Sequence, residues 1–586
     1  MFATLLKPAR RYVLLLLSLS AVVASGQWRW MDPLKEEQPV IQNQGWSDEI
    51  GHSFTRLPQR AKDEVREELW ELSRHSAGLA IHFYSNAPEI EVQYAVKGTM
   101  SMAHMPATGV SGVDLYSINS DGVWQLHYGG RPSGDTIRYH FRQPVQEKYH
   151  RHGREFRLYL PLYNEVDWMK IGVPDTCEFA FLPVSLEKPI VLYGTSIAQG
   201  ACASRPAMAW SSVVQRRLDY PLINLGFSGN GRLEKEMIRY LSELDARLYI
   251  LDCLPNLEDQ SEAEVIRRIQ SSVRGLRETH QTPILLVEHS GLSHAETGTE
   301  WAETIDRLNR ASRIAFDRLQ QEGVKDLHYI TRQEIGIPAD GWVDLVHPND
   351  VGAMVQATSM EKKIRDILSL PVGALTTQQP VSQRREPDMY EWKERHQLQL
   401  KHHLQEPPRA IVLGNSIVHY WGGDTSAPRQ NGAESWEQVM RRADYHNQGC
   451  GWDRIENLLW RVYHDELSGF QAEEVVVMIG TNNLDFNSDE EIVAGIRFLL
   501  GAIRQRQPRT RLRLVALLPR RDKELRIKQL NRQLQQMAQE EKWQFVNPGL
   551  RLLQTNGRID ESLFLDGLHP NGKGYAKLVK EIAGEG

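Results

Sequence analysis

Two serines of this 586-residue chain are each followed, about 150 residues later, by an aspartate and a histidine in the pattern Asp-x-x-His-Pro-Asn. The first set is Ser196, Asp344 and His347, and the second set is Ser416, Asp566 and His569. Serine and histidine are 151 residues apart in the first set and 153 in the second. A serine hydroxyl becomes an effective nucleophile when a histidine takes its proton, and a carboxylate fixes the tautomer of that histidine. The pattern therefore predicts two sites for acyl transfer through serine.

Each serine directly follows a short apolar run that is typical of a buried strand, at 189–193 and at 410–413. Further apolar runs follow at matching positions in both halves, and helical stretches such as 301–321 and 527–540 separate them. Continuous apolar strands that alternate with helices predict a parallel sheet covered on both faces. The serines and the other polar motifs then lie just past the carboxyl ends of strands, where open α/β sheets build their sites.

With two further blocks between each serine and its histidine, the chain resembles the SGNH (GDSL-type) hydrolase family. These blocks are strands that enter turns at 222–229 and 445–452, and strands that end in asparagine at 247–256 and 475–482. The resemblance covers residues 186–370 and 398–586. It implies two flavodoxin-like, three-layer α/β domains, each with a Ser-His-Asp triad that hydrolyses esters.

The resemblance also implies an oxyanion hole in each domain. Its members would be Gly229 and Asn256 in the first domain and Trp452 and Asn482 in the second. Trp452 stands five residues past Asn447, where the first domain has Gly229 five residues past Asn224. A tryptophan can offer its backbone N–H there only if the turn tolerates a Cβ. Each donor to an oxyanion typically lowers the barrier by roughly 3 kcal/mol.

Composition and motif order divide the chain into five predicted segments. They are a signal peptide (1–26), an N-terminal β-sandwich module (27–185), a first hydrolase domain (186–370), a linker (371–397) and a second hydrolase domain (398–586). Short alternating strands with turn signals favour an antiparallel sandwich in the module. The run 105–116 resembles the β-rich module that precedes some bacterial members of the family.

The chain begins with a basic stretch, an apolar run over 12–23 and small residues, which together predict an exported protein, periplasmic or extracellular. The apolar run is too short for a comfortable membrane span. Cleavage removes Lys7, Arg10 and Arg11 and changes the formal net charge from −6 to −9. This balance offers no electrostatic footprint for nucleic acid. Four cysteines are too few for a disulfide framework; pairing of Cys202 with Cys253 and the oligomeric state stay open.

The residues after each serine favour a small acyl group on a sugar. Small and polar residues and then Arg205 follow Ser196, and a mixed aromatic and polar stretch with Trp421 follows Ser416. We expect Arg205 and Trp421 to be substrate contacts, Arg205 through a carboxylate, although a core position for Trp421 stays open. Together with export, this predicts a carbohydrate O-acetylesterase. The arrangement resembles the two-lobed sialate and polysaccharide acetylesterases of bacteria, so the expected partner is an O-acetylated glycan.

Two other classes of function stay open. A lipolytic or thioesterase enzyme would have a long apolar pocket. A protein with one catalytic lobe and one glycan-binding lobe would explain why Trp452 stands in place of a glycine. Neither a metal ion nor an organic cofactor is expected, because the predicted triads supply both the nucleophile and the base.

Overall fold

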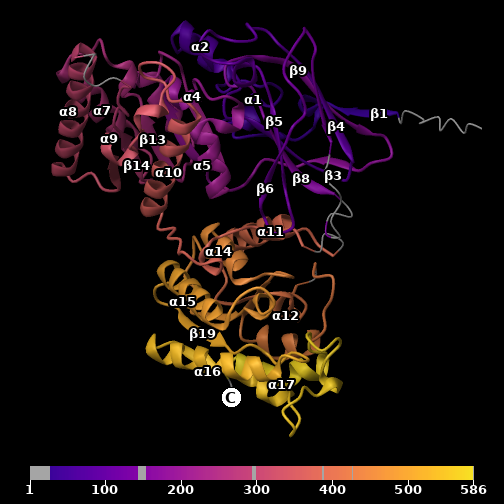
Figure 1. The fold of residues 1–586 in the computed structure, drawn as a ribbon. Coiled ribbons are helices and arrows are strands. Elements are labelled where there is room, and N and C mark those ends of the chain that lie inside the picture. Colours follow the sequence, from indigo (N-terminus) through magenta and orange to yellow (C-terminus); the bar gives the residue numbers. More distant parts are fainter. Residues whose placement is uncertain are drawn as a thin grey trace, which may run out of the picture.

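The computed structural model describes residues 27–142, 149, 153–293, 299–385, 389–424 and 426–584. It has three parts: a β-rich module, a first α/β domain beside it, and a second α/β domain beneath both (Figure 1). Within these ranges, every helix lacks the length or the apolarity that crossing a membrane requires. The predicted signal peptide (1–26) lies outside the described residues.

The N-terminal module is a sandwich of two antiparallel sheets. One sheet has the order β1 (Trp28–Met31), β9 (Val166–Pro174), β4 (Glu89–Val96) and β7 (Ile137–Arg142). The other has the order β10 (Phe179–Phe181), β3 (Ala80–Ser85), β8 (Arg154–Tyr159), β5 (Asp114–Ile118) and β6 (Trp124–His127), and β2 (Ile41–Gln42) pairs with β3. Alternate residues such as Val92 of β4 and Phe83 of β3 meet in one core. Its short helices are α1 (Ser47–Ile50), α2 (Glu67–Ser73) and α3 (Ala107–Val110).

The first α/β domain has a parallel five-stranded sheet in the order β12 (Leu222–Gly226), β11 (Ile190–Gly194), β13 (Leu248–Asp252), β14 (Ile284–Val287) and β15 (Leu327–Ile330). Helices α5 (Trp210–Leu218) and α10 (Asp350–Ile367) cover one face. Helices α6 (Lys235–Leu241), α7 (Glu262–Arg277) and α8 (Thr299–Gln321) cover the other. The short helices are α4 (Ser196–Gln199) and α9 (Arg332–Ile335). This is the flavodoxin-like strand order.

The second α/β domain repeats that order with β17 (Tyr445–Gly449), β16 (Ala410–Gly414), β18 (Glu474–Met478), β19 (Arg511–Val515) and β20 (Gln544–Val546). Helices α14 (Ile455–Tyr463), α15 (Asp489–Arg506) and α16 (Glu524–Glu540) cover one face. The other face is covered by α17 (Gly572–Ile582) and by the helical turn Trp436–Met440, which follows the short α13 (Ala433–Ser435). Helix α12 (Ser416–His419) follows β16, and α11 (Trp392–Gln405) precedes the sheet. The predicted fold class is confirmed for both hydrolase domains and for the module.

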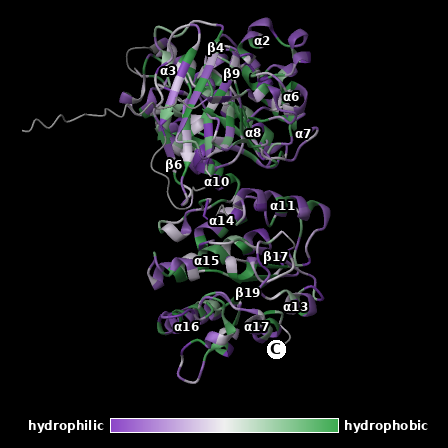
Figure 2. Cartoon of the chain, turned by 90° about the vertical axis from the view of Figure 1, so that its right-hand side faces the viewer, coloured by the Kyte–Doolittle hydropathy of each residue, from purple (hydrophilic) through white to green (hydrophobic). Residues whose placement is uncertain are grey.

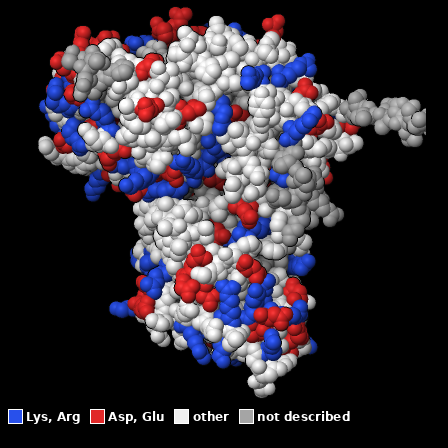
Figure 3. Space-filling view, in the orientation of Figure 1, with Lys and Arg blue, Asp and Glu red and all other residues white. Residues whose placement is uncertain are grey.

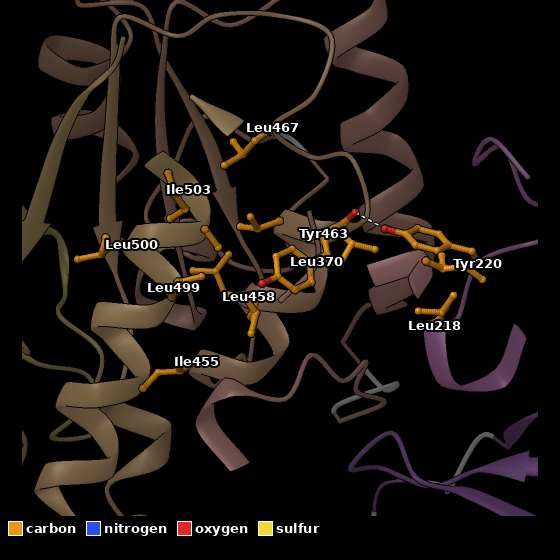
Figure 4. Close-up of a cluster of buried hydrophobic side chains, with 14 of the residues drawn as sticks. Leu218, Tyr220, Leu370, Ile455, Leu458, Tyr463, Leu467, Leu499, Leu500 and Ile503 are labelled. Carbon is orange, nitrogen blue, oxygen red and sulfur yellow. Dashed lines mark hydrogen bonds between the residues drawn. The ribbon is translucent and has the colours of Figure 1, made fainter. Parts of the chain in front are cut away.

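The two α/β domains share one hydrophobic cluster. Leu218 and Tyr220 of the first domain and Leu370 after α10 pack toward Leu458 and Tyr463 of α14 (Figure 4). The Tyr220 hydroxyl donates a hydrogen bond to the carbonyl of Tyr463 across this boundary. The helices α5 and α10 on one face of the first sheet therefore share a core with α14 and α15 of the second domain. In the second domain, α14 and α15 lie on the face that corresponds to the one carrying α6 and α7 in the first.

The module also packs on both neighbours, which cover the outer face of its second sheet. Every residue of β8 is buried. Tyr159 of β8 donates to Gln215 of α5 at 3.0 Å, and Glu155 of β8 pairs with Arg384 of the predicted linker. Hydrophobic residues, green in the cartoon of Figure 2, run through the interior of each part, where the clusters of buried residues lie. On the face shown in Figure 3, basic and acidic residues are interspersed.

Candidate active sites

Each predicted nucleophile is the first residue of a short helix. That helix directly follows the first strand of its domain along the chain, which is second in the spatial order of the sheet. Ser196 begins α4 after β11, and Ser416 begins α12 after β16. The neighbouring strands end in Gly226 and Gly449, because nothing larger fits there. A Cβ at Gly226 would lie 2.2 Å from a backbone nitrogen of α4, and a Cβ at Gly449 would lie 2.2 Å from a backbone nitrogen of α12. The sheet thus fixes both serines at its carboxyl edge.

The structure brings the first predicted set together. Ser196 Oγ lies 2.9 Å from His347 Nε2, and His347 Nδ1 lies 2.8 Å from Asp344 Oδ2. Partial burial works to raise the pKa of Asp344, but hydrogen bonds from the side chain and backbone of His347 and from Val346 hold it below its ordinary value. An ionised carboxylate only accepts hydrogen bonds. The proton of neutral His347 is therefore assigned to Nδ1, and Nε2 is the acceptor that faces Ser196.

The second predicted set has the same geometry. Ser416 Oγ lies 2.8 Å from His569 Nε2, and His569 Nδ1 lies 2.7 Å from Asp566 Oδ2. Partial burial works to raise the pKa of Asp566, but hydrogen bonds from the backbone and side chain of His569 hold it below its ordinary value. Each site therefore holds a serine, a histidine that can accept its proton, and a carboxylate that fixes the imidazole.

The asparagine that ends each Asp-x-x-His-Pro-Asn motif caps the next helix. Asn349 Oδ1 accepts from two backbone N–H groups in the first turn of α10, and Asn571 Oδ1 does the same for α17. Such a cap satisfies donors that the helix itself leaves unpaired. The motif therefore has two parts: its asparagine anchors the loop on a helix, and its aspartate and histidine face the serine.

In the first domain the predicted oxyanion residues lie on two neighbouring turns. Gly229 has a φ of +69°, in the left-handed region that suits glycine. Asn256 Oδ1 accepts the backbone N–H of Gly231 at 3.1 Å. This bond fixes the amide orientation, and among the described residues its Nδ2 has no hydrogen-bond acceptor. The Asn256 amide can therefore donate to a bound oxyanion.

In the second domain Trp452 takes the backbone conformation of its glycine counterpart, with a φ of +64°. The turn thus tolerates a Cβ. The amide differs, because Asn482 Nδ2 donates to the carbonyl of Asp453 at 3.0 Å. An amide group has two hydrogens, so one remains for a ligand.

Sequence reasoning missed the side chains that tie each nucleophile helix to the oxyanion turn. Gln199 Oε1 accepts the backbone N–H of Ser228 at 3.0 Å, and His419 Nδ1 accepts that of Gly451 at 3.1 Å. Burial lowers the pKa of His419 to about 2, so its ring is neutral and can accept. Gln199 and His419 each stand three residues after the serine, and this shared spacing was the available signal.

The strand asparagines Asn224 and Asn447 have a structural part in the site that was also missed. Asn224 Nδ2 donates to the carbonyl of Ala198 at 2.7 Å, and Asn447 Nδ2 donates to that of Val418 at 2.6 Å. Both amides thereby fasten the helix that begins with the nucleophile to the neighbouring strand.

The two predicted substrate contacts lie in different surroundings. The Arg205 guanidinium donates to Asp114 Oδ2 at 3.0 Å and to the Tyr116 hydroxyl at 2.9 Å, so its charge compensates a buried carboxylate of the module. Trp421 is fully buried, stacks on Tyr575 and donates its indole N–H to a serine hydroxyl. The prediction of Trp421 as a substrate contact is wrong, because Trp421 belongs to the core. Arg205 joins the module to the first domain with a partly exposed side chain, and its contact with substrate stays a prediction.

A cavity of about 590 Å³ opens at His347, and the N-terminal module forms one of its walls. The module contributes Glu67, Glu68, Glu71, Leu72, His75, Met102, His104 and Tyr163, and the first domain contributes Ala201, Ser228, Asn230 and His347. The His104 ring lies over the His347 ring with centroids 5.9 Å apart. The described lining has three carboxylates and neither lysine nor arginine. The first site is therefore built from two parts of the chain, which the motifs did not indicate.

The four cysteines carry free thiols. Cys253 Sγ lies 3.6 Å from the carbonyl of Tyr193. Cys202 lies beside the Asp344–His347 pair, with one ligand atom of each residue within 4.8 Å of the others. Burial raises the pKa of Cys202 to about 12, so it packs against the pair as a neutral thiol. A protonated thiol is a poor metal ligand.

Models of known families match all three parts. Residues 187–365 match one model of the GDSL-like lipase/acylhydrolase family, and residues 412–577 match another. Residues 28–179 match the N-terminal module of SGNH-hydrolase-type esterases.

Individual relatives agree with these matches. Subunit alpha2 of human platelet-activating factor acetylhydrolase IB is 30% identical over 167 residues, which are 27% of this chain and 72% of the relative. Subunit alpha1 of the human enzyme is 24% identical over 196 residues, covering 33% and 80%. A crystal structure from Bacteroides ovatus, described as that of a GDSL-like lipase, is 31% identical, covers 58% of this chain and 98% of its own, and superposes with a TM-score of 0.54.

Proposed function

We propose, from the premise that this chain belongs to the GDSL-like (SGNH) hydrolase family and is an esterase with two such domains in tandem, that both domains remove O-acetyl groups from carbohydrate. The observation that carries this proposal is the repeated geometry: serine, histidine and aspartate make the same hydrogen bonds in both domains. The predicted signal segment supports a periplasmic or extracellular place of action.

In the first site, His347 Nε2 takes the proton of Ser196 as the hydroxyl attacks the acetyl carbonyl carbon. Asp344 stabilises the imidazolium that forms. The negative oxygen of the tetrahedral intermediate receives hydrogen bonds from the Gly229 N–H and Asn256 Nδ2. Collapse breaks the bond to the sugar oxygen, which takes the proton from His347. Water, deprotonated by the same histidine, then releases acetate and restores the serine.

The second site performs the same steps with Ser416, His569 and Asp566. Trp452 supplies the backbone N–H, and Asn482 uses the amide hydrogen that Asp453 does not hold. The two sites differ in their surroundings, so we expect them to differ in preferred sugar or in the position of the acetyl group.

Two observations support an acetyl ester of a neutral sugar. The human relatives are named as acetylhydrolases, which supports acetyl as the acyl group. The first cavity is broad, and its three glutamates, Glu67, Glu68 and Glu71, repel an anionic substrate. Arg205, the residue expected to meet a sialic acid carboxylate, is engaged with Asp114 instead. Within the class of acetylated glycans we therefore favour neutral polysaccharide over sialoglycan for the first site.

Acetate release tests this proposal. The substrates are an O-acetylated neutral polysaccharide and an O-acetylated sialoglycan, compared for the wild type, Ser196→Ala, Ser416→Ala and the double variant. We expect release from the neutral polysaccharide by both single variants and none by the double variant. If one single variant is inactive, the other domain is a binding lobe or acts on a different ester. If the wild type releases nothing from either glycan, the carbohydrate assignment is wrong.

A phospholipid acetyl ester is a second candidate, because the human relatives are named after platelet-activating factor. A series of chromogenic esters of rising acyl length, and an acetylated lysophospholipid, separate the two candidates. Faster turnover of the lipid than of any acetylated sugar would favour this second function.

A further inference from the structure

The second oxyanion turn is held from outside its own domain. The carbonyl of Gly451 accepts hydrogen bonds from Gln383 Nε2 at 2.9 Å and from the Tyr390 hydroxyl at 2.6 Å. The carbonyl of Trp452 accepts from Arg385 Nη1 at 3.2 Å. Gln383, Arg385 and Tyr390 all belong to the predicted linker (371–397). The linker therefore binds the backbone on both sides of the Trp452 N–H.

The hydrogen bonds from the linker hold a residue with a Cβ in a left-handed conformation, which the first site does not require because it has glycine there. A left-handed backbone is disfavoured for a residue with a Cβ, and Trp452 has a φ of +64° where the first domain has glycine. Such a conformation persists when its surroundings over-determine it. In the first domain, by contrast, the carbonyl of Gly229 accepts from Arg232 of the same turn. Arg66 of the module also donates to the side chain and the carbonyl of Asn230, so both turns have external hydrogen bonds, but only the second uses them to hold a residue with a Cβ in this conformation.

Arg385 connects the second turn to the N-terminal module. Its side chain is only 3% exposed and pairs with Asp121, in the loop between β5 and β6, at 2.6 Å. A second bond from Nη1 reaches Asn457 Oδ1 of α14 at 3.2 Å. The loop between β5 and β6 and the linker approach each other closely at Gly122. A Cβ at this glycine would lie 2.1 Å from the carbonyl oxygen of Ser382. One guanidinium thus joins the module, the oxyanion turn and a helix of the second domain.

We propose that Arg385 is a positioning residue for the second active site, and that the N-terminal module, through Asp121, supports catalysis in a domain that lies far along the chain. Arg385 holds Trp452 in the left-handed conformation that presents its N–H to the oxyanion. The inference rests on the proposed esterase activity of the second site. It assigns the module a part in both sites: at the first it forms a wall of the cavity and contacts the turn through Arg66, and at the second it anchors the turn through Asp121 and Arg385.

The test uses the full chain with Ser196→Ala, so that acetate release reports the second site alone. Arg385→Ala is expected to lower kcat by about tenfold to a hundredfold with KM within about twofold, because an oxyanion donor acts mainly in the transition state. Added guanidinium ion should restore part of kcat. Asp121→Asn, at a half-exposed side chain, should lower kcat by a few-fold without unfolding the protein. Arg409→Ala, which removes an exposed arginine paired with Glu473, is the matched control.

A double-variant comparison separates positioning from general destabilisation. Trp452→Gly removes the disfavoured conformation, so Arg385→Ala should cost clearly less kcat in that background. Unchanged kcat in folded Arg385→Ala, a rise in KM alone, or an equal loss with and without Trp452→Gly would each overturn the inference. If the parent variant Ser196→Ala shows no turnover, the proposed activity of the second site is wrong, and the inference about Arg385 falls with it.

Discussion

Replacing Asn256 by alanine or by aspartate separates the two tasks of its side-chain amide. Oδ1 accepts the Gly231 N–H at 3.1 Å and thereby orients the group. Nδ2 is the proposed donor to the oxyanion. Alanine removes both atoms, whereas aspartate keeps the acceptor and replaces the donor by a second oxygen of nearly the same size.

The expected magnitudes follow from these contacts. Alanine should lower kcat of the first site by about 10²–10³, equivalent to about 2.7–4 kcal/mol of transition-state stabilisation. Gly231 is buried, so alanine also leaves its N–H without an acceptor, which should lower the stability of the protein by about 1–3 kcal/mol. Aspartate should cost at least as much as alanine, because its charge repels the oxyanion that forms beside it.

The assay is acetate release by the full chain with Ser416→Ala, so that the first site alone is measured. Asn556→Ala, at an exposed turn of the second domain, is the matched control. If Asn256→Asp keeps kcat within about tenfold of the parent protein, positioning of the turn rather than donation is the main role of Asn256, and the oxyanion assignment is refuted.

Two further predictions concern packing. Gly226→Ala should lower kcat of the first site by about 10² or more, because its Cβ would lie 2.2 Å from backbone of α4 and displace Ser196; equal rates for this variant and its parent would contradict the role of that close approach. Glu155→Gln should destabilise the protein by about 3–5 kcal/mol, because it leaves Arg384 buried without its counter-charge; Arg157 keeps its salt bridge with Asp219. Burial works to raise the pKa of Glu155, but Arg384 and Lys393 hold it well below its ordinary value. Its contribution is therefore present above the unfolded pKa of about 4.3 and is lost as the pH falls through the folded one. Thermal unfolding at pH 7 and below pH 4 measures this, and equal stability of variant and wild type at pH 7 would contradict it.

The sheets and the two serine sets were predictable because their signals are local and repeated. Apolar runs announce β11 and β16, and the matched spacing of Ser196 to His347 and Ser416 to His569 makes chance agreement improbable. The strand order follows from the family resemblance. Each of these features is contained in a short stretch of sequence that occurs twice.

The substrate contacts were not predictable in this way, because they depend on what packs against each residue. Arg205 follows the nucleophile in sequence, but Asp114 of the module neutralises it. Trp421 stands in a polar stretch, yet the domain core encloses it. Arg385 occurs in a segment that resembles a linker. Its role arises from contacts with Trp452, which is 67 positions away in the sequence, and with Asp121, which is 264 positions away. Long-range packing of this kind leaves no periodic trace in the sequence.

The shared hydrophobic cluster between the two hydrolase domains has an evolutionary consequence. Once Leu218, Tyr220 and Leu370 were buried against α14 and α15, deletion of either copy would have exposed an apolar surface on the survivor. Loss of one domain is therefore costly to the other. Selection can still alter or erase the chemistry of one copy, but it has to keep the body of that copy as a structural support.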